Sequence, residues 1–338
     1  MIRVAINGFG RIGRLAFRLM EESEEFEVVA INDLTDAEQL AYLLKYDTNH
    51  RNYRIDEISN DLENIIIGKR KIRVYAEKDP ALLPWKELDI DVVFECTGLF
   101  TSEESAMAHI HAGAKKVIIS APAKGNLKTI VYNVNHKILT GDEKIISAAS
   151  CTTNCLAPVV DVLDKEFGIK KGYMTTIHAY TNDQATLDIA HKKGIKARRG
   201  RACAANIIPA STGAASAIGK VCPNLEGKME GVAMRVPVPT GSVIDLVLEL
   251  GKNTTAEEIN EVFKNNQNQT LVYTDDPIVS SDVIGRRLGA LVDGLSTNVL
   301  EVEGKQLVKI VAWYDNEMGY TTQMVRTAKY LMNLNNTI

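Results

Sequence analysis

The stretch "RVAINGFGRIG", residues 3–13, decides the fold of the first half of the chain. It begins as a short apolar run typical of a buried strand, and it ends with Gly8, Gly10 and Gly13 in the order G-x-G-x-x-G. Apolar residues then recur at the spacing of one helix face. The pattern predicts a strand, a tight turn and a helix, which together begin a βαβ unit. The residues of that helix face are Ile12, Leu15, Ala16, Leu19 and Met20.

The three glycines predict a phosphate-binding turn. Gly8 permits the turn, Gly10 lets the backbone approach a pyrophosphate, and Gly13 lets helix and strand pack closely, while the helix N-terminus offers free N–H groups. The triplet could also close an ordinary βα unit. However, Asp33 follows the second strand, about 20 residues after the last glycine, where a carboxylate binds a ribose 2′-hydroxyl. Because that carboxylate would repel a 2′-phosphate, we expect NAD rather than NADP.

The remaining pattern predicts an α/β protein with two parts. Runs in the first 150 residues are apolar on both faces and indicate a Rossmann-type doubly wound parallel sheet. After residue 150, longer alternating runs favour an α+β domain with a mixed or antiparallel sheet. Residues 183–201 are polar and basic and read as a long loop, and residues 316–334 as a closing helix. The expected strands are 3–7, 26–32, 91–98, 116–120, 129–133 and 144–147 in the first part, and 172–181, 242–250 and 305–314 in the second.

Length, charge and cysteine content limit the class of protein. At 338 residues the chain is long enough for two domains. Its formal net charge of −4 gives no support to nucleic-acid or membrane-surface binding. Apolar runs fall short of the roughly 20 residues of a membrane span, and the first ten residues already read as structure rather than as a signal peptide. Five cysteines, an odd number, favour a reducing compartment. We therefore expect a soluble cytoplasmic protein.

The motif "SAASCTTNCLAP", residues 147–158, places Cys151 and Cys155 one helical turn apart. A metal site, a disulfide, inert core sulfur and a nucleophile are the alternatives. Zinc needs four ligands, and the other cysteines offer no matching pair; a cytosolic disulfide at this spacing is disfavoured. Cys155 reads as a small core residue. Cys151 differs because Ser150 can cap a helix there, and a helix N-terminus favours the thiolate.

A nucleophilic cysteine needs a base, and His178 is the best of six histidines. It ends a long expected strand and is followed by the polar "AYTNDQ". A Cys/His couple and NAD together give one coherent chemistry, which is aldehyde oxidation. Attack by Cys151 gives a thiohemiacetal, loss of hydride leaves a thioester, and His178 takes the hydroxyl proton. Phosphate could then attack the thioester to form an acyl phosphate.

Seven motifs resemble those of the glyceraldehyde-3-phosphate dehydrogenase family and run in the family's order from Asn7 to Tyr320. The resemblance implies an NAD-binding domain at residues 1–149, a catalytic domain at 150–314 and a C-terminal segment at 315–338 whose helix packs back on the first domain. It implies oxidation of D-glyceraldehyde 3-phosphate, with inorganic phosphate, to 1,3-bisphosphoglycerate in glycolysis, by a homotetramer without a metal. The motifs are "NGFGRIGR", "NDLTD", "SAASCTTNCLAP", "TTIHAYTNDQ", "RACAANIIPASTGAA", "RVPVPTGSV" and "WYDNEMGY".

The resemblance also implies roles for individual residues. Cys151 would be the nucleophile and His178 the base. The substrate's phosphate would be bound by Thr181 and Arg235. The attacking phosphate would be bound by Ser150, Thr152, Thr212, Gly213 and Arg199. Guanidinium groups and small hydroxyls suit tetrahedral oxyanions. Besides the glycines and Asp33, the cofactor would be bound by Asn7, Arg11, Ile12, Lys78, Thr97, Ser120, Asn316 and Tyr320.

The sequence departs from the family pattern at one position, and three alternative functions remain. Many NAD-using members carry a proline near the position of Ala190, and this chain has none, which loosens the expected preference for NAD over NADP. The related erythrose-4-phosphate dehydrogenase matches poorly at "HAYTND". A non-catalytic NAD-binding sensor or surface-binding protein would not need Cys151, His178 and both phosphate sets. A cysteine hydrolase would leave the glycine pattern and Asn316 unexplained.

Overall fold

The computed structural model describes residues 1–334, which form two compact units. Residues 335–338, the end of the expected C-terminal segment, lie outside the described residues. The first unit contains residues 1–132, 136–150 and 321–334, and the second contains residues 133–135 and 151–320.

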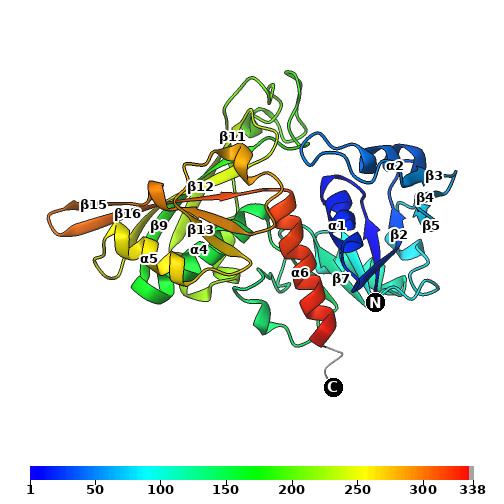
Figure 1. Cartoon of the computed structure of the whole chain (residues 1–338), viewed down its shortest axis with the longest axis horizontal. Helices are drawn as coiled ribbons and strands as arrows, with labels where there is room; N and C mark the ends of the chain where they lie inside the picture. The colour runs from blue at the N-terminus through cyan, green and yellow to red at the C-terminus, as the bar shows by residue number, and fades with distance from the viewer. Residues whose placement is uncertain (335–338) are drawn as a thin grey trace. The chain divides into compact units, whose positions relative to one another are not determined.

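The first unit is built on one twisted sheet with the strand order β3-β4-β5-β2-β1-β6-β7-β8. From β5 to β8 every neighbouring pair is parallel, whereas β3 and β4 form an antiparallel edge. Helix α1 packs against β1 and β2 (Figure 1). The expected doubly wound sheet is confirmed. Its elements are β1 (Ile2–Asn7), α1 (Arg11–Glu21), β2 (Phe26–Asn32), α2 (Ala37–Lys45), β3 (Ile58–Asn60), β4 (Asn64–Ile67), β5 (Arg70–Tyr75), β6 (Val92–Glu95), α3 (Glu103–His111), β7 (Lys116–Ile119) and β8 (Ile145–Ser147).

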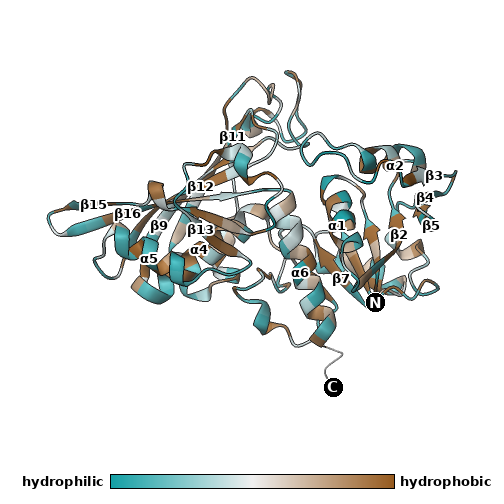
Figure 2. Cartoon of the chain, viewed as in Figure 1, coloured by the Kyte–Doolittle hydropathy of each residue, from teal (hydrophilic) through white to brown (hydrophobic). Residues whose placement is uncertain are grey.

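The central strands of this sheet are buried along their length because both faces are covered. Every residue of β6 and β7 is buried, and Figure 2 shows the apolar colour along β1, β2 and β7. In a parallel sheet all carboxyl ends meet at one edge, where ligands bind in open α/β folds. The polar residues Asn7, Asn32 and Thr97 end or follow strands at that edge.

The second unit is built on a mixed sheet with the order β10-β11-β9-β12-β16-β14-β13, in which β15 also pairs with β16. The pairs β9·β11 and β13·β14 are parallel, and the other pairs are antiparallel. Helix α4 packs on β9, β12, β14 and β16. Its elements are α4 (Cys151–Phe167), β9 (Ile169–Ala179), β10 (Ile208–Ser211), β11 (Met229–Val236), β12 (Ser242–Leu250), α5 (Ala256–Asn265), β13 (Leu271–Thr274), β14 (Ala290–Asp293), β15 (Asn298–Val302) and β16 (Lys305–Tyr314). The last helix, α6 (Met318–Leu334), begins in this unit and continues from residue 321 in the first.

Two expectations about individual strands were wrong. Residues 129–133 form no ladder; Thr129 makes one isolated bridge to Ser147, and Ile130 and Val131 are buried in irregular chain. The strands β3, β4 and β5 were not expected, because β3 and β5 are rich in polar or charged residues and β4 is a run of only four residues, Asn64–Ile67.

Residues 321–334 of helix α6 pack within the first unit. The ring of Tyr330 lies edge-on to His136 at 4.6 Å, and Lys329 forms an ion pair with Glu25 at 2.5 Å. Among residues 1–334, no helix has both the length and the apolar composition needed to cross a bilayer.

Candidate active site

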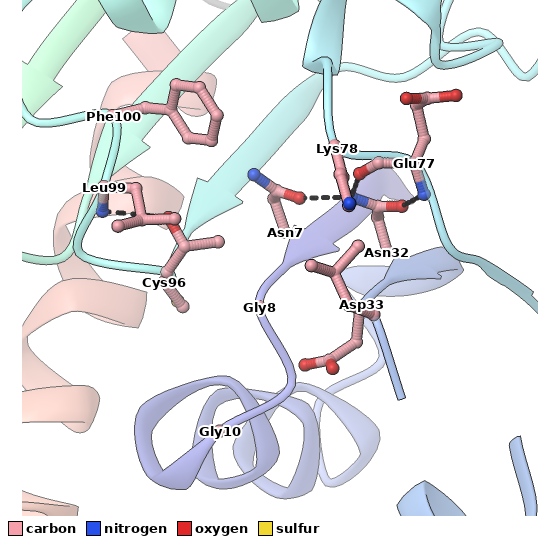
Figure 3. A pocket seen from close by; sticks show the side chains of 12 residues that line it. Asn7, Gly8, Gly10, Asn32, Asp33, Glu77, Lys78, Cys96, Leu99 and Phe100 are labelled. Carbon is pink, nitrogen blue, oxygen red and sulfur yellow. Dashed lines mark hydrogen bonds between the residues drawn. The ribbon is translucent and has the colours of Figure 1, made fainter. Parts of the chain in front are cut away.

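A pocket of about 540 Å³ opens at the carboxyl edge of the first sheet (Figure 3). It is lined by six of the residues expected to bind the cofactor: Asn7, Gly8, Gly10, Asp33, Lys78 and Thr97. Arg11, Ile12 and Gly13 form the first turn of α1 beside it, and Ser120 follows β7. Leu34, which follows Asp33, also lines the pocket. Sequence reasoning missed the remaining lining residues, which are Asn32, Glu77, Cys96, Leu99 and Phe100.

The glycine turn fits a dinucleotide phosphate. Gly8 has a φ of +91°, and a Cβ there would lie 2.8 Å from the backbone of Cys96 and Thr97. A Cβ on Gly13 would lie 2.1 Å from the carbonyl oxygen of Gly8. Gly10 is different because nothing lies within 4 Å of its Cβ position, so its backbone stays open to a ligand.

The hydrogen bonds of Arg11 and Asp33 determine which of their groups can bind a ligand. The guanidinium of Arg11 forms a bidentate pair with Asp47, at 2.5 and 3.0 Å, so the backbone of Arg11 is the part left for a phosphate. The carboxylate of Asp33 accepts from the backbone N–H groups of Phe9, at 2.7 Å, and Thr35, at 3.0 Å. It is thereby held against the glycine turn, where Figure 3 shows it beside Gly10.

Cys151 is the first residue of α4, and the register of the sheet places its partners. His178, near the end of β9, is the direct neighbour of Arg235 on the parallel strand β11. The Sγ of Cys151 lies 3.3 Å from Nε2 of His178. Cys151 keeps partial exposure, whereas Cys155 is fully buried one turn later, and all five cysteines are free thiols. The structure therefore brings the expected nucleophile and base together.

The other ring nitrogen of His178 fixes the tautomer. Nδ1 lies 2.7 Å from the carbonyl oxygen of Ala179, which can only accept, so Nδ1 carries a hydrogen. Arg235 Nη1 lies within about 3 Å of Nδ1 of His178, the carbonyl of Ala179 and the hydroxyl of Thr181. The two hydrogens of Arg235 Nη1 can be donated to the carbonyl of Ala179 and the hydroxyl of Thr181, so Nδ1 of His178 is not needed as an acceptor. The lone pair of Nε2 is consequently available to take the proton of Cys151.

Burial opposes charge on both members of this pair. It raises the pKa of the Cys151 thiol, while the positive charge of Arg235 acts in the opposite direction. Burial, followed by the charge of Arg235, lowers the pKa of His178 to about 3. The expected effect of the helix terminus on the pKa of Cys151 is thus opposed by desolvation. Both pKa shifts favour the neutral pair, in which the proton is on Sγ and faces the lone pair of Nε2.

Tyr314, which sequence reasoning missed, holds the two elements in register. Its hydroxyl, at the end of β16, lies 2.9 Å from the hydroxyl of Thr152 in α4 and 2.8 Å from that of Thr176 in β9. All three side chains are buried. Because Thr152 follows Cys151 and Thr176 precedes His178 by two residues, these bonds set the distance between Sγ and Nε2.

A second cluster extends from Arg235 into the long loop. Thr181 accepts from Arg235 at 3.0 Å and donates to Asp183, which also forms an ion pair with Arg199. Asp183 was not singled out in the sequence, although its place two residues after Thr181 was a signal. Burial, followed by the charge of Arg235, lowers the pKa of Arg199. Thr181, Arg199 and Arg235 therefore form a cationic site with a hydroxyl, which suits a phosphate.

The structure places the other expected residues without joining them to this cluster by a described hydrogen bond. Thr212 accepts from Ala214, and Gly213 accepts from Ala217, both within their own turn. Asn316 Oδ1 accepts from Gly241 N at 3.1 Å and Ser242 Oγ at 2.9 Å, so its NH₂ group is oriented away from them. Ser150 immediately precedes α4, and Tyr320 lies buried in the first turn of α6.

The fold and the pocket together define a nucleotide-dependent oxidoreductase. The family description "Glyceraldehyde 3-phosphate dehydrogenase, NAD binding domain" matches residues 2–103, and "Glyceraldehyde 3-phosphate dehydrogenase, C-terminal domain" matches residues 150–316. The chain belongs to the glyceraldehyde-3-phosphate dehydrogenase family, and it is an NAD-dependent enzyme.

Curated relatives are similar along almost their whole length. The chain is 58% identical over 334 residues to glyceraldehyde-3-phosphate dehydrogenase of Clostridium pasteurianum and 56% identical over 334 residues to that of Clostridium acetobutylicum. It is 53% identical over 337 residues to the enzyme of Streptococcus pyogenes. Each match covers 99% of both chains.

Proposed function

We propose that the protein oxidises D-glyceraldehyde 3-phosphate and joins the product to inorganic phosphate, giving 1,3-bisphosphoglycerate in glycolysis. The observation that carries the proposal is the 3.3 Å contact between Cys151 and His178 beside the arginine cluster. The couple supplies a nucleophile and a base, and the arginines supply sites for phosphate.

The first step is attack on the aldehyde. Nε2 of His178 takes the thiol proton as Cys151 Sγ bonds to the aldehyde carbon, and the proton then passes to the aldehyde oxygen. The product is a thiohemiacetal, and the histidine is again neutral. Burial of His178, which lowers its pKa, favours the return of that proton.

The second stage releases the acyl group. NAD, when bound, supplies the hydride acceptor that turns the thiohemiacetal into a thioester. His178 takes the hydroxyl proton as the C=O bond forms. An oxygen of inorganic phosphate then bonds to the thioester carbon, and the carbon–sulfur bond breaks. Cys151 recovers a proton, and the acyl phosphate leaves.

We assign the substrate's phosphate to Thr181 and Arg235, and the attacking phosphate to Ser150, Thr152, Arg199, Thr212 and Gly213. We assign the cofactor to the lined pocket of the first unit, with Asn316 offering its NH₂ group to the nicotinamide carboxamide. We retain the functional division into residues 1–149, 150–314 and 315–338, and a cytoplasmic location.

A homotetramer is the assembly that we propose. Leu187, Ile189 and Ile195 in the long loop are 76%, 68% and 94% exposed. Exposed apolar side chains also lie on one face of β9, β12, β15 and β16: Tyr173, Val247, Leu300 and Leu307. Apolar side chains gathered on a surface in this way mark protein interfaces.

The test is an assay of reduced-cofactor absorbance with glyceraldehyde 3-phosphate, run in parallel with NAD and NADP. We expect turnover with NAD that depends on phosphate or arsenate. Erythrose 4-phosphate as the better substrate, or hydrolysis independent of phosphate, would reject the proposal. Cys151→Ser should abolish turnover and leave NAD binding intact; surviving turnover would place the nucleophile elsewhere.

A further inference from the structure

A buried hydrogen-bond chain lies directly behind the dinucleotide pocket. It joins Trp85, His109 and Glu95, and it reaches the pocket through Asn7 and Thr97. The side chains of Glu95 and His109 have no exposed surface. The proposed reaction does not use this chain.

The tryptophan keeps the histidine neutral. Trp85 Nε1 lies 3.0 Å from Nδ1 of His109, and an indole N–H can only donate. Nδ1 therefore accepts and carries no hydrogen. The ring hydrogen must be on Nε2, which lies 3.0 Å from Oε2 of Glu95 and donates to it. His109 thus gives Glu95 a hydrogen bond without a compensating positive charge.

Hydrogen bonds also fix the orientation of the side-chain amides of Asn32 and Asn7. The backbone N–H of Glu77 donates to Oδ1 of Asn32 at 2.9 Å, which fixes the amide of Asn32. Asn32 Nδ2 then donates to Oδ1 of Asn7 at 2.7 Å. Asn7 must present its own Nδ2 to Glu95 Oε2, at 2.5 Å. Figure 3 shows the part of this chain that lines the pocket.

The other oxygen of Glu95 receives two more hydrogens. The backbone N–H of Thr97 donates to Oε1 at 2.8 Å. The hydroxyl of Thr97 accepts from Leu99 N at 3.0 Å and donates its own hydrogen to Oε1. Four groups thus donate to the two oxygens of Glu95: His109 Nε2, Asn7 Nδ2, and the backbone N–H and hydroxyl of Thr97. Glu95 is therefore a carboxylate, with neutral partners on both oxygens.

From this arrangement we infer that Glu95 is a specificity-determining residue that makes the pocket favour NAD⁺ over NADH. The two forms differ by one positive charge, and a negative charge in the pocket wall favours the less negative ligand. Asp33, Glu77 and Lys78 also carry charge at the pocket, but they are partly or largely exposed and screened by solvent. Glu95 is enclosed by protein, where a charge acts over a longer range.

The field of Glu95 reaches the pocket lining at Cys96. Burial, followed by the negative charge of Glu95, raises the pKa of this thiol to about 12. Cys96 lines the pocket, and the Cys96–Thr97 peptide is the surface against which Gly8 packs.

The experiment measures the dissociation constants of NAD⁺, NADH and ADP-ribose for the wild type and Glu95→Gln by calorimetric titration. Removing the charge should raise the ratio of the NAD⁺ dissociation constant to the NADH dissociation constant by about tenfold, the size of effect that one poorly screened charge can produce. Damage to the pocket would weaken all three ligands alike and leave that ratio unchanged. Equal losses for the three ligands, or no loss, would overturn the inference.

Two variants serve as controls. Glu95→Asp keeps the charge and should keep the wild-type ratio within about twofold, even if all three ligands bind more weakly. Glu77→Gln removes a carboxylate that is open to solvent and should move the ratio much less. If Glu95→Gln is too unstable to titrate, the difference between the rises in Tm with NAD⁺ and with NADH reports the same preference. If Glu95→Asp changes the ratio of the NAD⁺ constant to the NADH constant as much as Glu95→Gln does, the size of the side chain rather than its charge sets the preference, and the inference is wrong.

Discussion

At the scale of single residues, the reactivity of Cys151 depends on a proton acceptor. Burial raises the pKa of its thiol, and His178 Nε2, at 3.3 Å, is placed to take the proton. We expect His178→Asn to lower kcat by about 10²–10⁴-fold, the usual contribution of a general base. The rate at which iodoacetamide alkylates Cys151 at neutral pH should fall in the same variant.

The matched control is His111→Asn, which changes an exposed histidine at the end of α3. It should leave both kcat and the alkylation rate at wild-type values. If His178→Asn alkylates as fast as the wild type, the thiolate forms without the histidine, and the pairing has no chemical role.

Cys96 provides a pH-dependent prediction. Its pKa is raised to about 12 by burial and by the charge of Glu95, so the thiol form persists until pH approaches that value. We expect Cys96 to remain almost unlabelled by iodoacetamide at pH 8, although it lines the pocket. Its labelling rate should rise about tenfold per pH unit from 8 to 10, without a plateau, because the thiolate fraction rises at that rate below the pKa. Mass spectrometry of labelled peptides measures this, and a plateau below pH 10 would contradict it.

Sequence reasoning found residues whose residue type suggests a chemical role. It missed residues that only position other side chains. The proximity of Cys151 and His178, at 3.3 Å, could be predicted because few residue types can serve as a nucleophile and a base. Tyr314 and Asp183 were not, because a tyrosine at a strand end or an aspartate in a polar loop has many uses. Only the register of β9 and β11 brings Arg235 beside His178, and no local pattern encodes that pairing.

At the scale of elements, the turn between β1 and α1 contains one glycine needed for packing, Gly13, and one that leaves space for a ligand, Gly10. A Cβ on Gly13 would lie 2.1 Å from Gly8 O, inside the packing of the turn, whereas Gly10 has open space around its Cβ position. We expect Gly13→Ala to lower the free energy of unfolding by about 1–3 kcal/mol through overpacking. Gly10→Ala should leave stability within about 0.5 kcal/mol and weaken NAD binding, because the methyl group projects where a phosphate approaches. Chemical denaturation and NAD titration of both variants distinguish these effects. Unchanged NAD affinity in a folded Gly10→Ala protein would contradict the role of this turn.

The strands differ in how well sequence predicted them. The bounds of β2, β12 and β16 agree with the apolar patterns, because each is a continuous ladder with at least one covered face. Residues 129–133 have a similar pattern but pair at one bridge only, since burial of Ile130 and Val131 does not require a ladder. Strands β3 to β5 lie at or near a sheet edge. Polar or charged residues make β3 and β5 hard to find by hydrophobicity, and β4 is an apolar run of only three isoleucines after Asn64.

At the scale of the whole molecule, the second sheet has an exposed apolar face. Tyr173 and Val247 are direct neighbours on β9 and β12 and are 48% and 40% exposed. Leu300 and Leu307 are direct neighbours on β15 and β16 and are 56% and 46% exposed. Lys309 pairs with Val247 and lies two residues from Leu307, so both pairs share one face of the sheet. Exposed apolar pairs that share a sheet face, here with Lys309 between them, are typical of an interface between subunits.

Leu307→Asp tests the proposed assembly at this face. A carboxylate at an apolar interface has no partner and must be desolvated, so association through the face should become much weaker. The fold itself should be retained, because Leu307 is already about half exposed and a surface change of this kind alters stability by about 0.5 kcal/mol or less. We therefore expect sedimentation equilibrium to show a tetramer for the wild type and a smaller species for Leu307→Asp at the same concentration. The matched control is Leu62→Asp, which changes a leucine that is 97% exposed in a turn of the first unit and should leave the mass unchanged. If Leu307→Asp sediments as the wild type does, this face is not a subunit interface and the exposed loop residues must carry the assembly. A loss of mass in both variants would instead indicate a general effect of added negative charge.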